Sequence, residues 1–161
     1  MTLSSVTVKK VVAFYVLIGS VICIFLFLSY LGFLGFLSYL FPALFTLILY
    51  LFLITGGFLY LQKPYSKGRE VLLNITLAIQ TIQLSILGIH FENYFGPYAG
   101  IGVDFTSTLN FFFEFHSLSF QNRNGYSKGS NEMSLAVNLV PVAILLFISY
   151  LEKKEKEKRP D

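Results

Sequence analysis

Residues 11–31 read VVAFYVLIGSVICIFLFLSYL, and no charged side chain occurs from there until Lys63. A transmembrane helix needs about 20 apolar residues to cross a hydrocarbon core of roughly 30 Å. The uncharged run therefore predicts two membrane spans, at about 11–31 and 39–61, joined by the turn GFLGFLS at 32–38.

The composition of the whole chain also indicates lipid as its solvent. Of 161 residues, 55% are hydrophobic and only 13% are charged, which is far from the soluble average. The net charge is +3, and the basic residues gather at the ends of segments, so we expect a lipid bilayer as partner and no nucleic acid. The single cysteine, Cys23, excludes an intrachain disulfide.

Two further apolar stretches predict spans at about 71–90 and 135–151. Ten of the twelve basic residues then lie on one side of the membrane, so the positive-inside rule places both termini and the tail 152–161 in the cytoplasm. Segment 91–134 lies outside. The expected fold is one mainly α membrane domain over residues 1–161, a four-transmembrane-helix bundle with a small extracytoplasmic β element between helices 3 and 4.

The third expected span carries more polar side chains than the others. On a helix they form two opposed stripes, which predict polar contacts inside the membrane at Asn74, Thr76, Gln80, Thr81, Gln83 and Ser85. Either neighbouring spans or another subunit pack on both stripes, or Thr76, Gln80 and Gln83 line a polar pathway. In the second span, TGG at 55–57 indicates either close helix packing or a local bend.

The outer segment alternates between apolar and polar residues in three stretches, near 99–106, 109–116 and 133–139. This pattern predicts two or three strands, and an interfacial helix is the alternative. The strand reading puts Phe111, Phe113 and Phe115 on one face as a row of aromatic contacts. The alternation changes phase after His116, which predicts either a bulge or the end of the regular strand there. TST at 106–108 suits a hairpin, and Asn124-Gly125 suits a turn.

Chemistry is only weakly indicated. His90, Glu92, Glu114 and His116 are weak candidates for a metal or acid–base site, because their spacing matches no specific motif, and we expect no catalytic residue or cofactor. The leading hypothesis is a non-enzymatic accessory or scaffolding subunit of a membrane protein complex, bound to another membrane protein or to itself. The alternatives are a small transporter or pore for a neutral or weakly charged solute, and an outward-facing enzyme or metal site.

Overall fold

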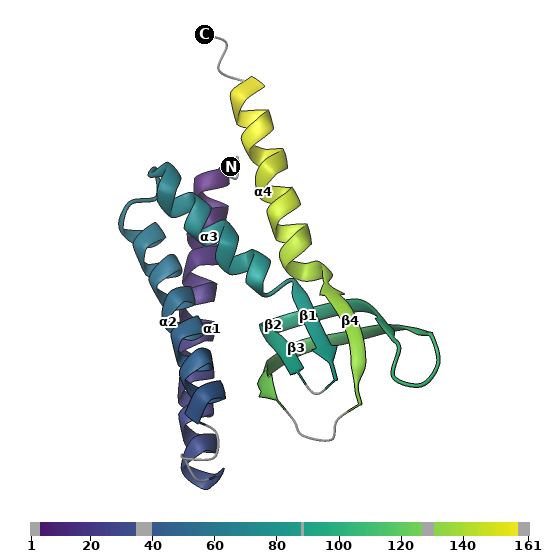
Figure 1. Ribbon diagram of the computed structural model, residues 1–161. Coiled ribbons are helices and arrows are strands. Elements are labelled where there is room, and N and C mark those ends of the chain that lie inside the picture. The colour runs from purple at the N-terminus through teal and green to yellow at the C-terminus, as the bar shows by residue number, and fades with distance from the viewer. Residues whose placement is uncertain (1–3, 35–39, 88, 127–130, 158–161) are drawn as a thin grey trace.

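A computed structural model describes residues 4–34, 40–87, 89–126 and 131–157 (Figure 1). Most of the expected turn at 32–38 and residues 127–130 of the β3–β4 connection lie outside these ranges. The chain contains, in order, α1 (Ser5–Leu34), α2 (Leu40–Gln62), α3 (Lys67–Ile79), β1 (Ile82–Ile86), β2 (Ile89–Asp104), β3 (Asn110–Tyr126), β4 (Met133–Asn138) and α4 (Leu139–Glu157).

Helices α1 and α2 form an antiparallel hairpin (Figure 1). A Cβ on Gly57 would lie 2.7 Å from the carbonyl oxygen of Ala13, so this glycine allows the backbones of the two helices to approach closely. Gly56 does the same toward Thr76 of α3. The TGG sequence therefore serves helix packing. By length and composition, α1 over Ser5–Ser29 and α2 over Leu44–Gln62 are candidate membrane spans.

The predicted four-helix transmembrane bundle is wrong, and so is the multi-pass topology drawn from it. Among the described residues only α1 and α2 are long and apolar enough to span. Helix α3 has 13 residues and is about 20 Å long, too short for a hydrocarbon core. Helix α4 begins at Leu139, because residues 133–138 form β4, and its last six residues, 152–157, are all charged.

The third expected span ends halfway because its residue pattern changes. Helix α3 stops at its C-cap Gln80, and the following residues alternate, with Ile82, Leu84 and Ile86 apolar and the odd positions polar. Alternation with period two and β-branched side chains favour a strand over a helix. Residues 82–86 accordingly form β1, and residues 89–104 form β2.

The strands make a four-stranded antiparallel sheet in the order β1-β4-β2-β3, and β1 also pairs with the start of β2. The three predicted strand stretches are present, but the sheet is larger than expected and includes residues predicted to be helical. The register of β2 against β3 shifts between Gly96 and Tyr98, where the partners are Ser119 and His116. Of the two alternatives predicted near His116, this confirms the bulge, because β3 continues to Tyr126. Asn124-Gly125, expected as a turn, lies within β3.

The sheet lies beside the α1–α2 hairpin (Figure 1), and it is anchored there by the part of β2 next to the bulge. Phe95 is buried against Gly19 of α1, where any Cβ would overlap its ring. The Tyr15 hydroxyl donates a hydrogen bond to the carbonyl oxygen of Phe95. The next residue, Gly96, has φ +89°, which favours glycine, and the Tyr15 hydroxyl occupies the place of its missing side chain.

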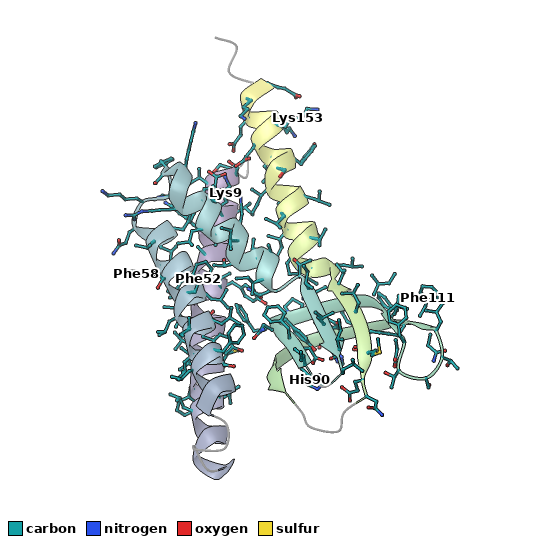
Figure 2. All side chains as sticks on the ribbon, viewed as in Figure 1. Lys9, Phe52, Phe58, His90, Phe111 and Lys153 are labelled. Atoms are coloured by element: carbon teal, nitrogen blue, oxygen red, sulfur yellow. The ribbon has the colours of Figure 1, made fainter. Side chains whose placement is uncertain are left out.

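A buried ion cluster joins three helices at the end of the molecule where Lys9 and Lys153 lie (Figure 2). Lys9 of α1 is only 4% exposed, and its Nζ contacts Glu70 of α3 at 2.7 Å and Glu152 of α4. Glu155 of α4 accepts hydrogen bonds from the backbone N–H and the hydroxyl of Ser5. The cluster fixes the relative positions of α1, α3 and α4.

We expect Lys9→Met to lower the stability of the protein by about 3 kcal/mol, because it leaves two partly buried carboxylates without their cation. Lys10→Met is the matched control, since Lys10 is the next residue and is exposed. Thermal unfolding of both variants in detergent micelles measures the difference. Equal unfolding temperatures would show that the cluster contributes nothing.

The stability of the cluster should depend on pH through Glu70. Burial alone would raise the pKa of Glu70, but the hydrogen bond and positive charge of Lys9 outweigh burial and hold that pKa below its ordinary value. Its stabilisation is therefore complete above about pH 4.3, the usual glutamate pKa, and is lost as pH falls through the lowered value. Glu70→Gln should unfold at a lower temperature than wild type at pH 7, and the gap should close toward pH 3. Glu157→Gln, at an exposed position, is the control and should leave the unfolding temperature unchanged both at pH 7 and near pH 3.

Candidate functional site: the two faces of the sheet

One face of the sheet is apolar and exposed. The pairing aligns two rows across all four strands, Leu84-Leu135-Val103-Phe111 and Ile82-Val137-Ile101-Phe113. Phe111, Phe113 and Phe115 on β3 are 77%, 66% and 66% exposed, so the described helices do not cover them. Phe111 lies at the end of the sheet away from the hairpin (Figure 2). The predicted aromatic row therefore exists as a surface, which we call the phenylalanine face.

The opposite face is polar and holds a cavity of about 340 Å³. Its lining comes from all four strands: Gln83, Glu92, Tyr94, Phe112, Glu114, His116, Ser134 and Ala136. Three of the four weak candidates for chemistry, all but His90, line this cavity, and His90 lies beside it through its contact with Ser85.

Small residues make the space for this cavity. The row Gln83-Ala136-Gly102-Phe112 crosses the sheet beneath it. A Cβ on Gly102 would lie 2.7 Å from the carbonyl oxygen of Leu135 and 2.5 Å from the ring of Phe112. Phe112 can therefore lie over the middle of the sheet only because position 102 has no side chain. This explains why Phe112 breaks the apolar alternation of β3.

His90 belongs to a buried network at the start of β2. The Ser85 hydroxyl lies 2.9 Å from His90 Nδ1 and donates to Glu92 at 3.1 Å. Because the serine proton is used on Glu92, Nδ1 of His90 carries a proton and donates to Ser85. Glu132 approaches the same Nδ1 at 3.6 Å. A catalytic triad needs the serine and the acid on different ring nitrogens, so this geometry orients Glu92 and does not activate Ser85 as a nucleophile.

His116 belongs to a separate aromatic row. Its ring stacks on Tyr98 with centroids 5.8 Å apart, and Tyr98 stacks on Tyr94 at 4.3 Å. Burial, followed by the charges of Tyr94 and Glu114, raises the pKa of Tyr98 to about 12, so its hydroxyl stays protonated and donates to Gln83 Oε1 at 3.0 Å. Glu114 lies 3.8 Å from His116 Nε2, which is an ion pair only when the histidine is protonated.

The polar contacts predicted for the third span divide between two elements. Thr76 and Gln80 of α3 are buried and hydrogen-bond to carbonyl oxygens of the same helix, as does Thr81 just after it. Asn74 also lies on α3, and its side-chain oxygen is buried with no partner among the described residues. Gln83 and Ser85 lie on β1. Thr76 and Gln80 do not line the cavity that Gln83 lines, so the structure does not assemble the predicted three-residue lining.

The described part of the chain holds no group of three or more His, Cys, Asp or Glu side chains that could bind a metal ion. The cavity residues that the sequence reasoning missed are Tyr94, Phe112, Ser134 and Ala136. The alternation at 89–92, with Ile89 and Phe91 apolar and His90 and Glu92 polar, was a signal that a strand begins before the predicted outer segment.

No protein-family model matches this chain, and neither a curated protein nor a solved structure matches it. The function is therefore inferred from the two contrasting faces of the sheet.

Filling the space above Gly102 tests how the cavity is built. We expect Gly102→Ala to destabilise the protein by about 1–3 kcal/mol, since the new methyl group meets a backbone carbonyl that cannot move aside easily. Gly68→Ala is the control, because no atom lies within 4 Å of a Cβ there and alanine in a helix is favoured over glycine. Chemical unfolding in micelles should show a loss for the first variant and no loss for the second.

Proposed function

We propose that this protein is a non-enzymatic, membrane-associated accessory or scaffolding subunit that binds another membrane protein through the phenylalanine face and the free edge of β3. The observation that carries the proposal is the exposure of three alternate phenylalanines on an edge strand. Large exposed apolar patches on proteins mark interaction surfaces.

Association with a membrane is supported by the hairpin. Only 33% of each candidate span is buried, and exposed apolar side chains such as Phe14, Phe25 and Ile48 cover the rest. The core helix of a soluble protein would be mostly buried. The end of the hairpin near Lys9 also carries Lys63, Lys67 and Arg69, and the charged end of α4 lies beside it (Figure 2). By the positive-inside rule we place this end, and with it both termini, in the cytoplasm.

The edge of β3 favours a protein partner over lipid. In the described residues β3 has a strand neighbour on one side only, and its residues 110–117 are exposed apart from half-buried Phe112. Lipid tails would accept the phenylalanines but cannot hydrogen-bond the free N–H and C=O groups of the edge. Water satisfies the edge but not the aromatic rings. A strand of another protein satisfies both, as in β-strand addition.

Site-specific photo-crosslinking in native membranes tests this proposal. A photoreactive phenylalanine analogue at position 113 should give one discrete protein adduct larger than the chain itself. The same analogue at position 14, on an exposed part of α1, is the matched control and should react with lipid. Phe111→Ala combined with Phe115→Ala should reduce the adduct at position 113 at least tenfold.

Two outcomes would overturn the proposal. Lipid adducts alone from position 113 would make the phenylalanine face a membrane-contacting surface. An adduct of twice the mass of the chain would make it an interface between two copies.

A further inference from the structure

The level at which the sheet touches α1 fixes its depth along the hairpin. Phe95 of β2 is buried against Gly19, and the Tyr15 hydroxyl donates to the backbone of Phe95. Gly19 follows Lys9, at the cytoplasmic end of the hairpin, by ten residues, which is a rise of about 15 Å on an α-helix. A hydrocarbon core is roughly 30 Å thick, so the sheet meets α1 about half a core thickness from that end.

Exposed apolar side chains lie on both sides of this level on α1. Phe14 is exposed beside Tyr15, and Phe25 and Leu28 are exposed farther from the cytoplasmic end than Gly19. The proposed function places such side chains in lipid, and this inference rests on that placement. Lipid then surrounds α1 above and below the attachment of the sheet. Figure 1 shows the sheet between the two ends of the hairpin.

The helices that carry the sheet give the same depth independently. Gly56 of α2, which packs against Thr76 of α3, lies six residues or about 9 Å before the end of α2 at Gln62. Strand β1 begins at Ile82, six residues after Thr76, which adds at most about 9 Å. Helices α3 and α4 also carry exposed apolar side chains at Val71, Ile75, Leu146 and Phe147. The sheet therefore begins near the middle of the hydrocarbon region.

The two faces of the sheet suit this position. Strands embedded in membranes turn apolar residues outward and polar residues toward the interior. The phenylalanine face is apolar, whereas the opposite face surrounds the cavity lined by Glu92, Glu114 and His116. Charged side chains inside a membrane face a water-filled cavity or a partner, since contact with lipid is costly. The cavity of about 340 Å³ has room for several water molecules at about 30 Å³ each.

The free edge of β3 then determines the kind of partner. At this depth no water reaches the edge from the lipid side, and lipid cannot pair its N–H and C=O groups. We propose that the sheet lies within the hydrocarbon region, with its polar face lining a water-filled crevice, so that the partner on the β3 edge is an extended segment embedded in the membrane. A partner that contacts the sheet from a water-exposed domain is excluded by this geometry.

Fluorescence quenching measures the depth of the sheet, because the chain contains no tryptophan. Phe113→Trp, Phe14→Trp and Tyr65→Trp each introduce one fluorophore, on the phenylalanine face, on α1 and on the exposed α2–α3 connection. The full chain is placed in phosphatidylcholine nanodiscs whose lipids carry bromine on the acyl chains. We expect the bromines to reduce the fluorescence from positions 113 and 14 at least twofold and to leave that from position 65 unchanged.

Two adjacent residues of β4 test the crevice. Ser134 lines the cavity, and Leu135 is exposed on the phenylalanine face. In the same nanodiscs Ser134→Cys should react with a small, water-soluble thiol reagent at least tenfold faster than Leu135→Cys. Both cysteines should react equally once the protein is unfolded. The wild-type chain is the control, because its single cysteine, Cys23, is buried.

The outcomes separate this inference from the subunit proposal. Quenching from position 113 by aqueous iodide, with quenching by brominated lipid retained at position 14, would place the sheet in water and overturn the inference alone. Equal reaction of the two cysteines in nanodiscs would overturn it as well. Loss of lipid quenching at position 14 would remove the hairpin from the membrane and overturn both proposals. The partner peptide crosslinked from position 113 should lie in a membrane segment of that protein, and a peptide from a water-exposed domain would overturn the inference while the subunit proposal stands.

Discussion

The contact between Phe95 and Gly19 is the constraint on which the arrangement of the molecule depends. The described helices leave the phenylalanine face uncovered, although an apolar sheet face is a surface on which helices commonly pack. Phe95 lies on β2 close to the bulge and is buried against α1, where Gly19 leaves room for its ring. Tyr15 adds a hydrogen bond to the backbone at the same point. The contact lies in the middle of β2, so Phe111, Phe113 and Phe115 on the first part of β3 stay exposed.

The ion cluster around Lys9 is the second connection between the sheet and α1. It lies at the N-terminal end of α3, and the C-terminal end of α3 leads into β1. Helix α3 runs from this cluster to β1, and α4 runs from β4 back to it, so the sheet is joined to the cluster by two short helices. By spacing alone, Glu152 with Lys156 and Glu155 with Arg159 are four residues apart and could form ion pairs within the tail. In the fold Glu152 instead contacts Lys9 and Glu155 contacts Ser5, since the tail is packed against α1. Spacing within one helix could not indicate partners on another.

The sequence was informative where one pattern dominated a long stretch. The uncharged run from 11 to 62 identified both helices of the hairpin, and alternation identified the last part of β2, the first part of β3 and all of β4. The prediction failed where the overall hydrophobicity of a stretch was considered without the spacing of its apolar residues. Residues 71–90 and 135–151 are apolar enough for spans, but their alternation at 82–86 and 133–138 belongs to strands that pair with each other. Within the candidate site, the row of phenylalanines could be predicted from the alternation of apolar and polar residues in β3. The cavity could not be predicted, because it depends on the strand register that brings Gln83, Gly102 and Phe112 into one row.

The pairing of β2 has a consequence for how the protein is made. Strand β2 pairs with β1, β3 and β4, and β4 is the last strand in the chain, ending at Asn138. The hairpin of α1 and α2 is complete at Gln62, long before that residue leaves the ribosome. N-terminal units fold first during synthesis. The α1–α2 hairpin is therefore folded while the sheet is still incomplete. Strands β1, β2 and β3 must be kept from pairing with other chains until β4 has been synthesised.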